Sequence, residues 1–473
     1  MKKRKTRQTK GKNRAKKESK PKAARKKHAL KKTSKPTRKT NSTQKRRGRP
    51  PKSVARRVGS VDRGVRRVGR PRKVEVVGLL GVRRRGRPRK VVAQDVSSVG
   101  GVVLPDVSSG SQVVPSSDVL PVKVHSHVLK PYLERLSRRY DLTYAEAQAA
   151  MAQIMSGRAS DAEIAGYLMA LSVKGPTPEE IAASASFMRD NAVSVKPVVN
   201  DVLVDVCGTG GDNAGTFNIS TTSMFIAAAA GVPIAKHGNR GVSSRSGSAD
   251  VLEALGVPID MPPEQVEDSI RYVGLGFIFA PAYHTAMKHV MPARKSLGVK
   301  TLFNILGPLS NPAGAQAHVI GVYEPQLLRP VSEVLKMLHV QRAFVVYGEP
   351  GLDEFSTCGE TKVADLAEGV IRTYSIQPDG FGLKRANIQD LAGGNPQENA
   401  QILRGILSGE DTGVRRDVVL LNAAAAIVAG GKAKYLADGV TKARNVLSDG
   451  KALEKLNEYI EFNKRFKSAK ASR

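Results

Sequence analysis

The chain has 473 residues, of which 77 are lysine or arginine and 42 are acidic, so its formal net charge is +35. Its two cysteines, Cys207 and Cys358, are too few for a disulfide framework or a thiolate zinc centre, and they indicate a reducing compartment. No apolar stretch approaches the length of a membrane span, so we expect a cytoplasmic protein with no membrane partner.

The excess positive charge lies in residues 1–90. This segment holds 39 lysines and arginines against three acidic residues, which leaves 38 basic and 39 acidic residues, or a net charge of −1, for the rest of the chain. No aromatic residue precedes Tyr132, so we predict that residues 1–90 form no core and are disordered when alone. Residues 1–45 are lysine-rich, as in a linker-histone tail.

Three related units with a Gly-Arg-Pro core recur in this basic tail, at residues 47–50, 68–73 and 85–90. They resemble the AT-hook, whose proline keeps the backbone extended while arginines enter the narrow minor groove of A·T tracts. A DNA-binding tail would imply association with the nucleoid. The tail could instead bind RNA or another polyanion, or be a transit peptide, although its lysines and prolines disfavour the latter. The residues expected to contact DNA are Arg47, Arg49, Arg70, Arg72, Arg85, Arg87 and Arg89.

A helical domain is expected over residues 127–198, after a low-complexity valine- and serine-rich linker at 91–126. Three capping boxes predict helix starts there. Apolar residues at the 3–4 spacing of a packed helix then predict a buried helix face. The capping pairs are Thr143 with Glu146, Ser160 with Glu163, and Thr177 with Glu180, and the apolar residues are Ile164, Tyr167, Leu168 and Leu171.

From residue 199 to 465, apolar runs alternate with helical segments, which predicts a mostly parallel α/β sheet. Strands are expected at residues 276–279, 318–323 and 343–347, and a short basic C-terminal tail at 466–473. The predicted fold class is therefore α/β, with a small N-terminal helical domain, a large sheet domain and a disordered basic tail in front.

A glycine-rich loop, Gly-Thr-Gly-Gly-Asp at residues 208–212, follows the apolar run 202–207 and leads into a helix-prone segment. A strand, a glycine turn and a helix N-terminus together bind phosphate through backbone N–H groups. The glycine spacing fits neither the dinucleotide fingerprint nor the Walker A loop. Its aspartate and hydroxyls favour a binding loop over a purely structural turn. Asp212 could take a substrate hydroxyl or a metal-bound water, and Thr216, Ser220 and Thr221 could donate to an anion.

A second polar loop, Lys-His-Gly-Asn-Arg-Gly at residues 236–241, follows the apolar run 232–235. Ligands of α/β sheets bind at the carboxyl ends of the strands, so we expect both loops to serve one ligand. Lys236 and Arg240 are expected as charge partners of a phosphate. In this setting we expect His237 to contact the ligand rather than to be an ordinary core histidine.

An acidic pair, Asp353 and Glu354, follows the apolar run 343–347 and a turn at 349–351. Adjacent carboxylates at a strand end suit Mg²⁺. From the residues alone, an Asp-Glu dipeptide lies more often on a solvated acidic surface than in a metal site. His284 and His289 are five residues apart, which places them on different faces of a helix and argues against a shared metal.

These motifs, in this order, resemble the anthranilate phosphoribosyltransferases. The resemblance rests on GTGGD with TFNIST, on KHGNR, on the segment from His284 to Gly298, on FNILGPLSNP and on GLDEFS, within residues 127–465. It implies a helical domain on an α/β domain, substrates in the cleft between them, and a homodimer formed through the helical domain. It also implies transfer of phosphoribosyl from phosphoribosyl pyrophosphate (PRPP) to anthranilate with release of pyrophosphate, a step of tryptophan biosynthesis.

The resemblance also implies roles for single residues. Arg294, Asp353 and Glu354 would serve catalysis, without a nucleophile, because metals and fixed dipoles can stabilise the departing pyrophosphate. Two Mg²⁺ ions are expected as cofactors, held by Ser220, Asp353 and Glu354. The PRPP site would comprise Gly208, Gly211, Asp212, Thr216, Asn218, Ser220, Thr221, Lys236 and Ser248. The anthranilate site would comprise Gly208, His237, Asn239, His284 and Arg294, whose guanidinium would steer the carboxylate.

Two other functions remain open at this point. A pyrimidine nucleoside phosphorylase shares the implied architecture, but the complete KHGNR loop, Arg294 and the acidic pair argue against it. The second is a nucleoid-associated DNA-binding protein on an inactive enzyme scaffold, which the intact set of expected ligands disfavours.

Overall fold

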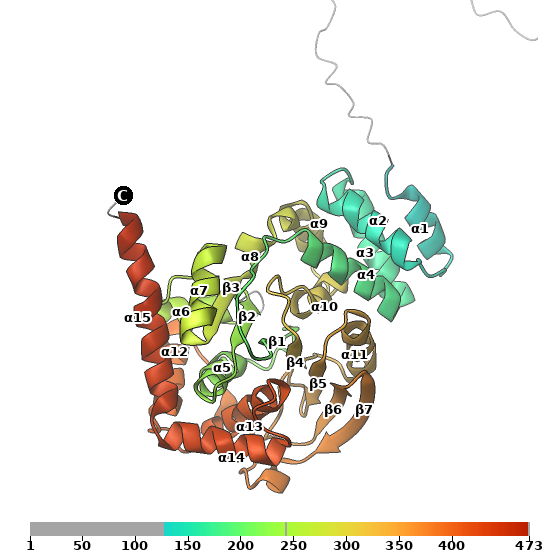
Figure 1. The fold of residues 1–473 in the computed structure, drawn as a ribbon. Coiled ribbons are helices and arrows are strands. Elements are labelled where there is room, and N and C mark those ends of the chain that lie inside the picture. Colours follow the sequence, from blue (N-terminus) through green and yellow to red (C-terminus); the bar gives the residue numbers. More distant parts are fainter. Residues whose placement is uncertain (1–126, 242–243, 472–473) are drawn as a thin grey trace, which may run out of the picture. The chain divides into compact units, whose positions relative to one another are not determined.

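The computed structural model describes residues 127–241 and 244–471, with side chains to residue 465 (Figure 1). The basic tail, the linker and the arginines expected to contact DNA lie outside the described residues. Within them, a helical bundle precedes a large α/β domain, so the predicted fold class of the folded part is confirmed. Every helix in this part of the chain is too short or too polar to cross a lipid bilayer.

Three of the four bundle helices begin where the sequence predicts. At the three predicted capping boxes, the side chain of the N-cap residue accepts the N–H of the glutamate three positions later, and the glutamate accepts the N–H of the N-cap. The predicted apolar face is buried, with Tyr167, Leu168 and Leu171 fully covered. The four helices are α1 Lys130–Ser137, α2 Tyr144–Met155, α3 Asp161–Lys174 and α4 Pro178–Asp190.

The described residues form a seven-stranded sheet in the order β3-β2-β1-β4-β5-β6-β7. All pairs from β3 to β5 are parallel, and the β5–β6 and β6–β7 pairs are antiparallel. The carboxyl ends of β1, β2, β4 and β5 therefore meet along one edge of the sheet. The strands are β1 Val204–Gly208, β2 Ile234–Gly238, β3 Leu275–Phe279, β4 Ala317–Gly321, β5 Arg342–Gly348, β6 Thr361–Ala367 and β7 Val370–Ile376.

Helices cover both faces of the sheet, as Figure 1 shows. On one face, α5 and α13 pack on β1, and α14 and α15 pack on α5. On the other face, α10 and α11 lie between the sheet and α4, so the bundle shares its hydrophobic core with this face. The helices are α5 Ile219–Ala229, α6 Ser248–Ala254, α7 Pro263–Val273, α8 Ala280–Tyr283, α9 Met291–Leu297, α10 Leu302–Leu309, α11 Leu328–Met337, α12 Pro396–Leu407, α13 Val414–Ala429, α14 Leu436–Ser448 and α15 Lys451–Ala471.

Three features differ from the expectations. The β6–β7 hairpin was not predicted, because β7 is largely exposed and carries no buried apolar run. His284 and His289 do not share an α-helix, since α8 ends at Tyr283 and a 3₁₀ helix, η1, spans Thr285–His289. Helix α15 continues to Ala471, so residues 466–471 extend this helix and are not a separate tail.

Candidate active site

The predicted site residues gather at the carboxyl edge of the sheet. The glycine loop follows β1, the Lys-His-Gly-Asn-Arg loop includes the end of β2, and the acidic pair follows β5. Strand β1 lies beside β2 and β4, and β4 lies beside β5, so these loops are neighbours although the acidic pair is more than a hundred residues from the other two in sequence.

Hydrogen bonds join the glycine loop to the acidic pair. The N–H of Gly210 donates to Oδ2 of Asp353 over 2.7 Å, and the N–H of Ser220, in the first turn of α5, donates to Oε1 of Glu354 over 3.1 Å. A Cβ at Gly208 would overlap the Asp353 carboxylate, and one at Gly321 would overlap the Asp353 backbone. Glycine is therefore required at both positions for this close approach.

The acidic pair carries more negative charge than its surroundings balance. Burial and the nearby Asp212 and Glu354 carboxylates raise the pKa of Asp353 well above its ordinary value. Burial raises the pKa of Glu354 to about 7, although Lys236 and Ser220 partly oppose this shift. Crowded carboxyl groups of this kind suit a divalent cation.

No group of three or more His, Cys, Asp or Glu side chains within the described ranges is arranged to hold a metal by itself. Mg²⁺ commonly binds through one or two carboxylates together with substrate phosphates and water. The pair formed by Asp353 and Glu354, with the Ser220 hydroxyl beside Glu354, fits that mode of binding.

Lys236 lies beneath the glycine loop as a buried cation. Its side chain is 1% exposed, and its ammonium donates to the Val206 carbonyl over 2.5 Å and to the Ser220 hydroxyl over 3.2 Å. Arg240 differs from the expectation of a phosphate partner. Its guanidinium forms ion pairs with Asp250 and Glu253, so its charge is already balanced.

The remaining residues of the expected PRPP site are held in place by hydrogen bonds near the glycine loop. The Thr221 hydroxyl donates to the Ser248 hydroxyl over 3.0 Å, which joins α5 to the first residue of α6. Asn218 donates to the Ser246 carbonyl and accepts from Asn399. Thr216 forms a β-bridge with Ala392, and Asp212 accepts the N–H of Ala214 while Gly211 adopts a φ of 77°.

Two buried histidines face each other at the expected anthranilate site. The ring centroids of His237 and His284 are 5.1 Å apart, and Nδ1 of His237 is 3.1 Å from the Gly307 carbonyl of α10. Burial lowers their pKa values to about 3 and 4, respectively, so both rings are neutral at pH 7. Their Nε2 atoms have no hydrogen-bond partner among the described residues, which leaves two polar atoms for a ligand.

Arg294 lies on α9, directly after η1. Its guanidinium is 5.6 Å from the centre of the Phe303 ring, and burial lowers its pKa. No carboxylate of residues 127–241 or 244–465 pairs with it, so a bound anion would be its natural counter-charge. Asn239 is exposed at the end of β2, and its carbonyl accepts the N–H of Ala249.

Two residues that were not predicted from the sequence form hydrogen bonds with β2, the strand that carries His237. Asp205 on β1 is buried and accepts the N–H of His237 over 3.2 Å, and burial raises its pKa to about 6. Asn311 donates to the Ala235 carbonyl over 2.8 Å. A polar residue inside the apolar run 202–207 was the available signal for Asp205, because a buried strand seldom carries an unpaired carboxylate.

Family models match most of the folded part. The α/β domain of a glycosyl transferase family matches residues 200–453, and the helical bundle domain of that family matches residues 130–192. The AT hook motif matches residues 44–55, 65–76 and 82–94, in the part of the chain that the structure does not describe.

Similar proteins cover the same region. An anthranilate phosphoribosyltransferase of Desulfosudis oleivorans is 51% identical over 332 residues, which are 70% of this chain and 98% of that protein. The crystal structure of anthranilate phosphoribosyltransferase from Thermus thermophilus is 45% identical, with a TM-score of 0.67 over 70% of this chain and 99% of that one. The Saccharomyces cerevisiae enzyme in complex with PRPP and Mg is 28% identical, with a TM-score of 0.66 over 71% and 98% of the two chains.

The family suggested by the sequence motifs is thus confirmed. The relatives are matched along nearly their whole length, and the matched region contains the glycine loop, the two histidines, Arg294 and the acidic pair. The chain therefore belongs to the anthranilate phosphoribosyltransferases, a family of pentosyltransferase enzymes.

Proposed function

We propose that the chain transfers phosphoribosyl from PRPP to anthranilate and releases pyrophosphate, the reaction of tryptophan biosynthesis that its family carries out. The observation that carries this proposal is the pair of hydrogen bonds that bring Asp353 and Glu354 onto the glycine loop and the start of α5. These hydrogen bonds support the proposal because they bring carboxylates that suit a metal close to backbone N–H groups that suit a phosphate. The yeast relative, solved with PRPP and Mg, supports the same use of this site.

The donor occupies the polar side of the site in this proposal. The backbone of Gly208 and Gly211 approaches its diphosphate, and Asp212 takes a ribose hydroxyl or a metal-bound water. Mg²⁺, as two ions, binds Asp353, Glu354 and the Ser220 hydroxyl and neutralises the developing charge of the leaving pyrophosphate. The other donor-binding residues are Thr216, Asn218, Thr221, Lys236 and Ser248.

Anthranilate occupies the side lined by the histidines. The Arg294 guanidinium pairs with its carboxylate and turns its amine toward the anomeric carbon of the ribose. His237 and His284 are neutral, so they present polar atoms without adding a second positive charge. Gly208 and Asn239 complete the site. A yeast relative, 27% identical, was solved in complex with 4-fluoroanthranilate, which supports an anthranilate site in this fold.

The test of this proposal is the consumption of anthranilate fluorescence in the presence of PRPP and Mg²⁺. Full-length protein and a variant that begins at residue 127 should both turn over, because the relatives correspond to that part of the chain. Glu354→Gln should lose activity, and inorganic phosphate with a pyrimidine nucleoside should give no product. No turnover by either form would contradict the proposal, and phosphorolysis of the nucleoside would favour the phosphorylase.

We also propose that the basic tail binds A·T-rich DNA, which would keep a cytoplasmic enzyme at the nucleoid. Three matches to the AT hook motif and the concentration of positive charge in residues 1–90 support this. A decisive variant replaces Arg49, Arg70 and Arg87 by lysine, which keeps the charge but removes the guanidinium groups. In gel shifts across a salt series, the native chain should prefer A·T-rich duplexes, and the variant should bind A·T-rich and G·C-rich duplexes equally. If the native chain binds A·T-rich and G·C-rich duplexes equally, the tail is an unspecific polycation.

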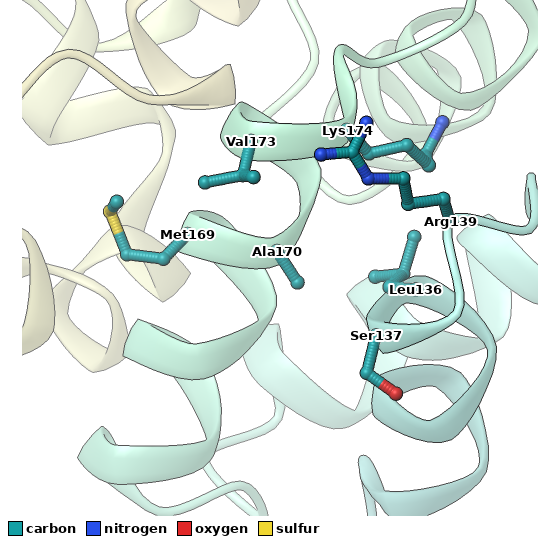
Figure 2. A pocket seen from close by; sticks show the side chains of 7 residues that line it. All are labelled: Leu136, Ser137, Arg139, Met169, Ala170, Val173 and Lys174. Carbon is teal, nitrogen blue, oxygen red and sulfur yellow. The ribbon is translucent and has the colours of Figure 1, made fainter.

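A homodimer formed through the helical bundle is the third part of the proposal. A hollow of about 260 Å³ lies between α1 and α3, and Figure 2 shows Leu136 and Ser137 on one side of it and Met169, Ala170 and Val173 on the other. Val173 is 67% exposed beside this hollow, so a second bundle could cover it. Sedimentation should give a dimer for the native chain and a monomer for Val173→Asp. A native monomer at micromolar concentration would exclude the pairing.

A further inference from the structure

We propose that Lys300 is an additional binding residue for the diphosphate of the donor. The inference rests on the proposed function and adds a cation that the glycine loop, the Lys-His-Gly-Asn-Arg loop and the acidic pair do not supply. Lys300 lies between α9 and α10, beyond Gly298, which ends α9 with a φ of 63°.

The position of the Lys300 side chain points to this role. Its ammonium nitrogen is 3.6 Å from the centre of the Tyr323 ring, and its Cε would lie 3.2 Å from a Cβ at Gly211. Tyr323 is itself held to the glycine loop, because its N–H donates to the Thr209 hydroxyl over 3.2 Å. Lys300 therefore lies over the loop that is proposed to receive the diphosphate.

The charge of Lys300 is available to a ligand. Lys300 is exposed, and within the described part of the chain it has no carboxylate partner. Two of the cations near the glycine loop are engaged, since Lys236 is buried against Val206 and Ser220, and Arg240 is paired with Asp250 and Glu253. A diphosphate brings several negative charges, so a free ammonium at the loop is complementary to it.

The aromatic ring provides a resting position that a phosphate can displace. A cation–π contact at an exposed site is weaker than a charge-assisted hydrogen bond between an ammonium and a phosphate oxygen. When the donor binds beside Gly211, the Lys300 ammonium would leave Tyr323 and donate to the diphosphate. Gly211 leaves the space that this side chain needs, because any Cβ there would crowd Lys300.

The test compares Lys300→Gln, Lys300→Arg and Lys336→Gln in the full-length protein. Lys336 is an exposed lysine at the end of α11, before β5, and so lies at the opposite edge of the sheet. The measurements are the KM values for PRPP and anthranilate and inhibition by pyrophosphate. Lys300→Gln should raise the KM for PRPP and the inhibition constant of pyrophosphate about tenfold and leave the KM for anthranilate within about twofold. Lys300→Arg and Lys336→Gln should resemble the native protein.

Unchanged constants for PRPP and pyrophosphate in Lys300→Gln, alongside an active native enzyme, would overturn this inference and leave the proposed function intact. Equal increases of both KM values would also overturn it, since they would indicate a general disturbance of the site. A native enzyme without turnover would instead refute the proposed function, and this inference with it.

Discussion

Single side chains at the site owe their chemistry to burial. The same low-dielectric setting keeps His237 and His284 neutral and raises the pKa of Asp353 and Glu354. Burial also lowers the pKa of Arg294, and no carboxylate pairs with its guanidinium in the described structure. The site therefore has an excess of negative charge at the acidic pair, which a metal can balance, and a positive charge at Arg294, which the carboxylate of anthranilate would balance in the proposed function.

Arg294→Ala should impair the use of anthranilate far more than the use of PRPP. Loss of a charge-assisted pair with the carboxylate should raise the KM for anthranilate by about 10- to 100-fold, because such a bond contributes about 1.5–3 kcal/mol. Steady-state kinetics with each substrate varied in turn would measure this, with Arg294→Lys as a control that retains the charge. Equal losses for both substrates would contradict the assigned role.

His318 predicts a pH dependence of folding stability. It is fully buried on β4, and burial and the charge of Arg189 lower its pKa to about 3, whereas in the unfolded chain the ordinary value is about 6.5. In acid, His318 therefore binds a proton in the unfolded chain but not in the native chain. With respect to this proton, the stability of the native chain is complete above pH 7 and is lost as the pH falls below about 6.5.

Urea unfolding at pH 7.5 and pH 5.5 would test this, with His318→Gln as the comparison. Between these pH values the native chain should lose about 1.4 kcal/mol more of its free energy of unfolding than the variant. Other groups titrate in both proteins, so their effects cancel in this difference. The same pH dependence in both would show that His318 binds its proton equally in the folded and unfolded chains, which would contradict the lowered pKa.

At the scale of elements, the capping boxes do more than start helices. The buried Glu180 carboxylate accepts the N–H groups of Thr177 and Leu142, both over 2.8 Å, and pairs with Lys174 over 2.9 Å. It thereby joins the start of α4 to the end of α3 and to the loop before α2. Glu146, at the same position of its own capping box, is more exposed and caps its own helix.

Glu180→Ala should therefore destabilise the bundle much more than Glu146→Ala. Removing Glu180 leaves the buried Lys174 with one largely exposed carboxylate partner, Asp141, and leaves two N–H groups without an acceptor, for an expected loss of about 3–5 kcal/mol. Glu146→Ala should cost about 1 kcal/mol. Chemical denaturation followed by circular dichroism measures both, and similar losses would contradict the structural role of Glu180.

Local sequence patterns predicted the helices and strands better than they predicted which residues contact one another across the fold. Capping boxes and apolar spacing were sufficient for α2 to α4, because these signals lie within a few residues. The β6–β7 hairpin was missed because β7 is exposed, although Glu368-Gly369, with φ angles of 52° and 73°, has the positive φ angles of a tight hairpin turn. The contact of Gly210 with Asp353 spans 143 positions, so no local pattern could have revealed it.

At the scale of the whole molecule, the net positive charge and the enzyme family's domains belong to different parts of the chain. Residues 1–90 carry the net positive charge, and the part that matches the enzyme family is close to neutral. The ion pair formed by Arg240 illustrates what sequence could not show, since Asp250 and Glu253 lie on the helix that follows and neutralise a residue expected to bind phosphate. The cations that we propose for the donor site are instead Lys236 and Lys300.

The central claim is that the glycine loop and the acidic pair bind one diphosphate together through magnesium. A crystal structure of the protein with PRPP and Mg²⁺ tests it most directly. We predict metal density at the carboxylates of Asp353 and Glu354, with the diphosphate between them and the backbone of Gly211. A diphosphate bound away from this edge of the sheet, or a metal that contacts neither carboxylate, would contradict the claim.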